Sequence, residues 1–146
     1  MYGNMVSESF RLFHLALAYL EDRKRSRATV REFRALGPEA CAHLLGDAGL
    51  APSEFDRAMG LPFASEDLLT PAMRSVGIDP AEFAEHNHPS YRELCRTCMS
   101  CDHRMRCRSD LGNAAFLRTY RDFCPNSIPF DALAASRGAV SDTRPN

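Results

Sequence analysis

Apolar residues in the first part of the chain recur at intervals of three and four positions. Four large side chains carry this spacing: Phe10, Phe13, Leu17 and Leu20. It is the spacing of one face of an α-helix. Leu12, Leu15 and Tyr19 widen that face, so the pattern predicts a first helix of about five turns.

Shorter helical patterns follow. Residues 28–36 form a second stretch that ends at Gly37-Pro38, and residues 38–45 resume as a helix with Pro38 in its first turn. Three later segments, 51–55, 64–69 and 79–83, each place Ser or Asp just before an acidic residue and apolar residues, as helix N-caps do. Gly49, Gly60 and Gly77 lie where the preceding helices should end.

No stretch alternates apolar and polar residues in the manner of a β-strand. The predicted fold is therefore all-α, a bundle of short helices with a cysteine-ligated metal site in the C-terminal half. We expect N-terminal helices with a basic stretch in residues 1–50 and a helical cysteine-rich region in residues 51–136. A flexible tail is expected in residues 137–146, and the whole chain should form one compact domain.

Charge and targeting signals narrow the class of protein. A net charge of −1 over 146 residues excludes a chain that is basic or acidic throughout. The apolar run 10–20 follows no basic segment and is interrupted by Arg11 and His14, so it does not resemble a signal peptide. It is also shorter than the roughly 20 residues of a transmembrane helix. We therefore expect a cytoplasmic protein with no transmembrane segment.

Cysteines cluster in the segment LCRTCMSCDHRMRC, residues 94–107. Cys95, Cys98 and Cys101 are separated by two residues each, Cys107 follows five residues later, and Cys124 lies in FCPN. In a reducing compartment such a cluster indicates metal ligands or redox groups rather than structural disulfides. By contrast, Cys41 lies among apolar residues of a predicted helix and fits a small buried side chain.

Four thiolates could bind either an iron–sulfur cluster or a zinc ion. The proline after Cys124 and the x2-then-x5 spacing favour a [4Fe–4S] iron–sulfur cluster, whose negative charge matches the surrounding arginines. Zinc is the alternative, although the chain lacks the second C-x2-C pair that zinc modules usually carry. His103, between Cys101 and Cys107, could also replace a cysteine as ligand.

A second candidate site is basic. Residues 23–34 carry six basic residues against Glu32, a local charge of +5. The stretch could contact the phosphates of a nucleic acid or be a solvated helix end. The six residues are Arg23, Lys24, Arg25, Arg27, Arg31 and Arg34.

The second half resembles a bacterial family known as domain of unknown function 6455. The resemblance lies in LLTPAMRSVGIDPAEF (68–83), CMSCDHRMRCRSDL (98–111) and FCPNSIPFDAL (123–133). It covers about half of the chain and implies that four cysteines act as a set, Cys98, Cys101, Cys107 and Cys124. Cys95 is additional to that pattern. Because Arg92 and Arg96 flank it in the sequence, we expect a lowered pKa and a reactive thiol that is not a ligand.

No catalytic constellation or nucleotide-binding motif accompanies these residues. The sequence therefore favours a small metal-binding protein over an enzyme. The first hypothesis is an iron–sulfur protein that senses oxygen or redox state or transfers electrons, with a protein partner. The alternative is a zinc-stabilised helical module that contacts nucleic acid or a protein.

Overall fold

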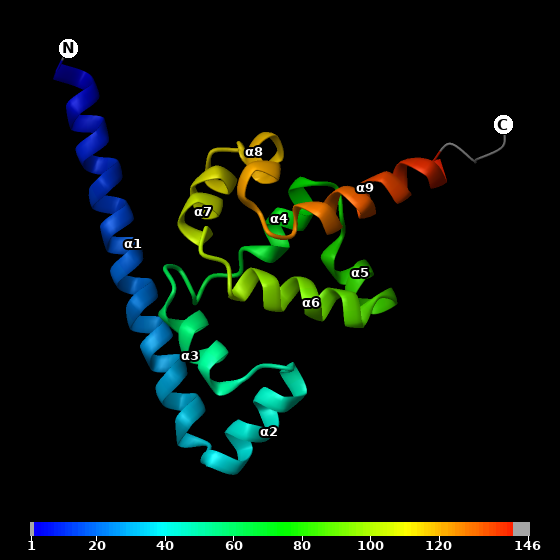
Figure 1. The fold of residues 1–146 in the computed structure, drawn as a ribbon. Helices are drawn as coiled ribbons and strands as arrows, with labels where there is room; N and C mark the ends of the chain where they lie inside the picture. Colours follow the sequence, from blue (N-terminus) through cyan, green and yellow to red (C-terminus); the bar gives the residue numbers. More distant parts are fainter. Residues whose placement is uncertain (1, 142–146) are drawn as a thin grey trace. The chain divides into compact units, whose positions relative to one another are not determined.

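The structure, a computed structural model, describes residues 2–141 and the side chains of residues 7–138 (Figure 1). All the regular structure in this range is helical, which confirms the all-α prediction. The helices are α1 (Tyr2–Ala35), α2 (Pro38–Ala48), α3 (Pro52–Gly60), α4 (Leu69–Ser75), α5 (Pro80–His86), α6 (His88–Met99), α7 (Arg104–Gly112), α8 (Phe116–Phe123) and α9 (Ser127–Ser141). Within the described residues, no helix is long and apolar enough to cross a membrane.

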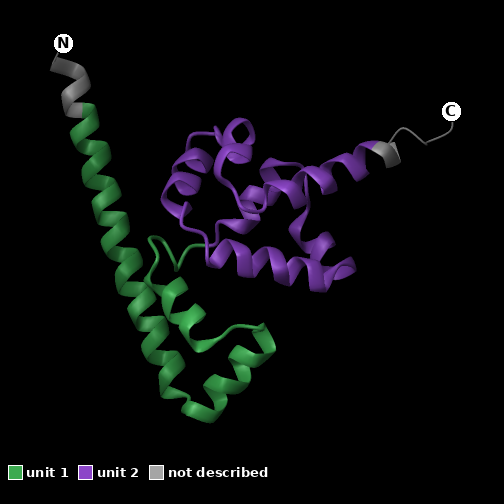
Figure 2. Cartoon of the chain, in the orientation of Figure 1, with its two compact units in different colours: residues 1–66 green, residues 67–146 purple. Residues whose placement is uncertain are grey.

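The chain divides into two compact units between Glu66 and Asp67 (Figure 2). Unit 1 contains α1 to α3, and unit 2 contains α4 to α9. The boundary expected after residue 50 falls in the connection between α2 and α3, inside unit 1. All the clustered cysteines belong to unit 2, and the basic stretch belongs to unit 1.

The first two predicted helices are one continuous helix. α1 spans 34 residues, so the expectation of short helices throughout is wrong for this element. The physical reason is that no glycine or proline occurs between Asn4 and Leu36, and nothing else in that interval ends a helix. α1 ends before Gly37, whose φ of 90° continues no helix, and α2 starts at Pro38.

Several predicted helix ends are confirmed. Gly49 caps α2 in the left-handed conformation, with a φ of 68°. Asp79 caps α5 by accepting hydrogen bonds from the backbone N–H groups of Ala81 and Glu82. At α3 the pattern predicts Ser53 as the N-cap, but the N-cap is Ala51. The N–H of Ala51 donates to the Glu54 carboxylate at 2.7 Å.

In unit 1 a buried carboxylate joins α1 to the segment after α3. Asp22 is only 1% exposed, and its Oδ1 accepts hydrogen bonds from Ser65, from N–H at 2.9 Å and from the hydroxyl at 2.6 Å. The next residue, Arg23, donates to the carbonyl oxygens of Gly60 and Leu61, which end α3. These contacts hold the C-terminal half of α1 against α3, as Figure 1 shows.

Unit 2 encloses the larger apolar core. Met73, Ile78 and Leu94 lie in it beside four aromatic side chains from the later helices. These four are Phe116, Tyr120, Phe123 and Phe130. α8 is strongly amphipathic, since Phe116, Tyr120 and Phe123 follow the three-and-four spacing and are all buried. α9 continues to Ser141, so residues 137–141 of the expected tail are helical, and residues 142–146 lie outside the described residues.

We expect Asp22→Ala to destabilise unit 1 by about 2 to 3 kcal/mol, because both Ser65 donors lose a charged acceptor in a buried place. Urea denaturation followed by circular dichroism measures the change. Glu21→Ala is the control, since Glu21 is exposed and its ion pair with Arg25 contributes little. Equal losses in the two variants would contradict the role given to Asp22.

Candidate metal centre

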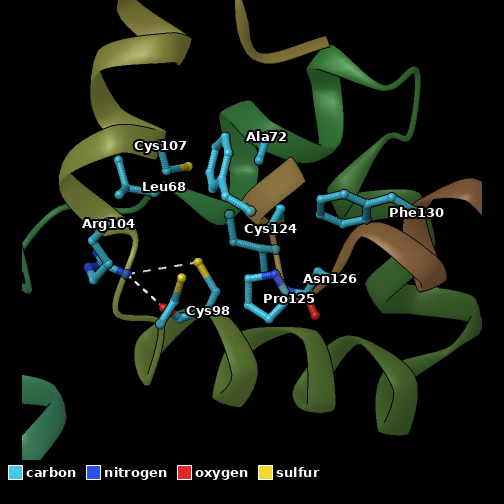
Figure 3. Close-up of a pocket in the computed structure, with 12 residues that line it drawn as sticks. Leu68, Ala72, Cys98, Arg104, Cys107, Cys124, Pro125, Asn126 and Phe130 are labelled. Carbon is cyan, nitrogen blue, oxygen red and sulfur yellow. Dashed lines mark hydrogen bonds between the residues drawn. The ribbon is translucent and has the colours of Figure 1, made fainter. Parts of the chain in front are cut away.

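Four cysteines of unit 2 reach one place from separate positions on the chain. Cys98 lies in the last turn of α6, Cys101 in the connection to α7, Cys107 on α7, and Cys124 directly after α8. Figure 3 shows the side chains of Cys98 and Cys107 extending toward the segment that carries Cys124. They are the four cysteines that the sequence resemblance selects as a set.

All four line a single cavity of about 20 Å³. Most of its remaining wall is apolar: Leu68, Leu69, Ala72, Phe123, Pro125 and Phe130. The polar side chains on the wall are those of Arg104 and Asn126. A space of this size holds about one water-sized sphere. The thiols therefore face a small, largely apolar enclosure rather than open solvent.

Hydrogen-bond donors point at the sulfur atoms. The backbone N–H of His103 donates to Cys101 Sγ at 3.3 Å, and the N–H of Asn126 donates to the sulfur of Cys124. In both cases the donor lies two residues after the cysteine. Backbone N–H groups at this spacing stabilise negative charge on sulfur, which is how protein loops support metal-bound thiolates.

A buried arginine adds positive charge beside the cysteines. Arg104 is 4% exposed, and its Nη1 donates to the carbonyl oxygen of Cys98 at 3.0 Å and approaches Cys98 Sγ at 3.8 Å (Figure 3). Because Arg104 begins α7 while Cys98 ends α6, this one side chain joins the two helices at the cavity.

Without a cation the buried thiols hold their protons. Burial raises the pKa of Cys98 to about 11, with Arg104 opposing the shift. Burial, with charge on Cys98, Cys124 and Cys101 adding to it, raises the pKa of Cys107 to about 12. The pKa of Cys124 is raised too, mainly by burial. The thiols are thus close enough to affect one another's ionisation, and a bound metal would have to displace their protons.

The thiols do not converge tightly on one point. Among the described residues, no three His, Cys, Asp or Glu side chains are placed so that they could hold a single metal ion. The metal site expected from the sequence therefore stays a prediction. What the structure adds is a common cavity with all four cysteines on its wall.

The other sequence candidates lie elsewhere. Cys41 belongs to unit 1, where its thiol donates to the carbonyl oxygen of Phe33 at 3.0 Å. The ring of His103 packs edge-on against Phe123 instead of lining the cavity, and its backbone N–H donates to Cys101 Sγ.

Cys95 does not line the cavity and packs against the core of unit 2. The lowered pKa expected for it is wrong: its pKa is raised, mainly by burial, with Asp67 adding to the shift against a hydrogen bond with Tyr91. The neighbouring Arg96 instead bonds Glu93 at 3.1 Å.

Sequence reasoning missed the polar groups that organise the cavity. Arg104 lies three residues before Cys107 and so shares a helix face with it, the one sequence signal that could have singled it out among the surrounding arginines. Asn126 lies two residues after Cys124, and its side-chain amide donates to the carbonyl oxygen of Leu94 at 3.1 Å in a buried position. That bond ties the segment after Cys124 to α6.

The basic stretch lies entirely on α1 and divides into two sets. Arg23, Arg25 and Arg34 bond within unit 1, to the α3 carbonyls, Glu21 and Asp56 respectively. Within the described part of the chain, Lys24, Arg27 and Arg31 make no ion pair or hydrogen bond through their side chains and are exposed.

Comparisons of the chain with protein-family models, with curated proteins and with solved structures found no match.

We expect Cys95 to be alkylated more slowly at neutral pH than an exposed thiol. Its raised pKa leaves less reactive thiolate there, and the rate should climb as the pH rises past the usual thiol pKa. Iodoacetamide labelling of the anaerobically purified chain, read by mass spectrometry at each cysteine, measures this. A peptide spanning residues 91–99 with Cys98 replaced by serine is the reference. Labelling of Cys95 at the peptide's rate at neutral pH would contradict burial as the controlling factor.

Proposed function

We propose that unit 2 binds an iron–sulfur cluster through Cys98, Cys101, Cys107 and Cys124, and that the protein senses oxygen or redox state or transfers electrons. The observation that supports this most directly is the shared cavity. It brings together cysteines from α6, the α6–α7 connection, α7 and the end of α8. Four thiolates are the usual ligands of a [4Fe–4S] cluster.

The cavity as it stands matches neither group, since a [4Fe–4S] core needs more room than one water-sized sphere and a zinc ion needs less. In a four-cysteine zinc site each sulfur lies about 2.3 Å from the metal, closer than a sulfur atom and a water molecule can approach. A cavity that admits a water-sized sphere is therefore too open for zinc as it stands.

The charges around the cavity suit a negatively charged group. A cluster with four thiolates is net negative, and Arg104 provides a buried cation next to Cys98. The N–H groups of His103 and Asn126 add partial positive charge at Cys101 and Cys124. Hydrogen bonds to the sulfurs and the degree of burial are also what tune the potential of such a group.

The cluster, when bound, would supply one-electron redox chemistry. The chain's own residues would hold it and control access to it. Leu68, Phe123 and Phe130 limit water on the inner side, whereas Cys98 and Cys101 are only half-buried. A centre so close to the surface is within reach of molecular oxygen or of a protein that donates or accepts electrons.

Zinc is the second candidate, because backbone N–H groups two residues after a cysteine support zinc thiolates as well. Zinc would require the four thiols to move together. It would then act as a structural link between α6, α7 and the end of α8, leaving the chain as a binding module.

Anaerobic purification followed by iron, sulfide and zinc analysis tests the proposal. We expect a brown protein with about four iron and four sulfide per chain. Cys107→Ser and Cys124→Ser should each lose the iron, whereas Cys95→Ser and Cys41→Ala should keep it as matched controls. A colourless protein with one zinc would establish the second candidate, and a protein that binds neither metal after reconstitution would refute both.

A further variant tests the buried cation. Arg104→Gln should weaken iron retention by about tenfold to a hundredfold, the usual effect of losing a group that supports a metal ligand. It should also lower the reduction potential, because the added electron loses a nearby positive charge. Arg104→Lys should restore part of the potential. A potential unchanged in Arg104→Gln protein that still holds iron would show that the arginine acts only on the fold.

A further inference from the structure

The exposed face of α1 carries apolar and cationic side chains in one line. Phe10, Phe13, Leu17 and Leu20 follow intervals of three and four residues, and all four are exposed. Lys24, Arg27 and Arg31 continue the same intervals without a break. On an α-helix such positions lie along one side. We call these seven residues the α1 stripe.

Among the described residues of unit 1, none covers this line. α2 and α3 pack against the C-terminal half of α1, and the side chains of residues 7–17 are exposed all around the helix. The three cations have no partner among the described residues. Leu20, Lys24, Arg27 and Arg31 also line a surface groove of about 490 Å³, together with Tyr19 and Arg23. Four large apolar side chains and three unpaired cations are thus presented together.

We propose that the α1 stripe binds the anionic surface of a lipid bilayer, with the phenylalanines and leucines inserted among the lipids and the cations on the headgroup phosphates. Apolar side chains beside basic ones on one helix face are what a helix in the membrane interface requires. Each Lys or Arg near an anionic leaflet adds to the attraction. Since no described helix can cross a membrane, the helix would lie on the surface rather than span it.

Two other occupants fit less well. A parallel pairing of two copies would set Lys24, Arg27 and Arg31 against the same cations, which repel. A nucleic acid would engage the three cations but would leave Phe10, Phe13 and Leu17 in water. An anionic lipid surface is complementary to both halves of the stripe.

Binding of the full chain to lipid vesicles tests this. We expect sedimentation with vesicles of phosphatidylcholine and phosphatidylserine, little with phosphatidylcholine alone, and weakening by salt. Leu20→Ser should reduce partitioning about tenfold, because it removes one inserted leucine. Leu12→Ser is its matched control: Leu12 is 67% exposed against 62% for Leu20 but lies off the stripe.

A second matched pair of variants tests the cationic residues of the α1 stripe. Arg27→Gln should reduce partitioning about fivefold, whereas Arg25→Gln, which changes the net charge equally, should have little effect because Arg25 lies off the stripe and pairs with Glu21. Circular dichroism confirms that each variant stays folded.

Several results would overturn the proposal. These are absence of vesicle binding, equal binding to uncharged vesicles, or equal losses in the two leucine variants. A dimer in analytical ultracentrifugation that Leu20→Ser abolishes, without vesicle binding, would assign the stripe to a second copy. Binding of an RNA or DNA oligonucleotide that Arg27→Gln weakens, again without vesicle binding, would assign it to nucleic acid.

Discussion

The structure of unit 2 depends on how negative charge on its buried cysteine sulfur atoms is compensated. Burial is the largest cause that raises the pKa of Cys98 and Cys107 and keeps both thiols protonated at neutral pH, and ionisation of one makes ionisation of the others harder. Four thiolates can therefore share this cavity only with a cation among them. Arg104 and two backbone N–H groups supply part of the compensation without supplying enough for four charges. The helices that carry the cysteines are in this way coupled to whatever occupies the cavity.

Features that depend on a few neighbouring residues, such as helix caps, were predictable from the sequence. The cap at Asp79 and the left-handed Gly49 depend on a few neighbouring residues, and both were predictable. The predicted break in α1 is absent, because the residues between the two expected helices contain nothing that ends a helix. A boundary needs a residue that removes a hydrogen bond or changes φ, and the first such residue is Gly37. The convergence of Cys124 with cysteines far earlier in the chain rested on resemblance, since spacing says nothing about a loop of that length.

Cys95 shows why charge near a residue in the sequence is a poor guide to its pKa. Arg96 is its direct neighbour, but adjacent residues on a helix point in different directions, and the guanidinium bonds Glu93. The thiol of Cys95 lies against the core and near Asp67, so burial and a carboxylate decide its pKa. Arg104 is the opposite case. It is six residues from Cys98, and the turn between α6 and α7 brings its guanidinium to the sulfur. Side-chain direction, which only the fold supplies, separates the two arginines.

The N-terminal half of α1 is helical although its described side chains, residues 7–17, are all exposed. Starting a helix is costly, but extending one is not, so the half that is held by Asp22 and Arg23 can propagate into the exposed half. The apolar residues there gain nothing from the helix itself, because they remain in water. Their regular spacing contributes to binding only when a partner surface covers them. A partner would then meet side chains already aligned, and binding would cost less conformational entropy than the ordering of a free segment. A long helix anchored at one end is thus a means of presenting the α1 stripe before its partner arrives.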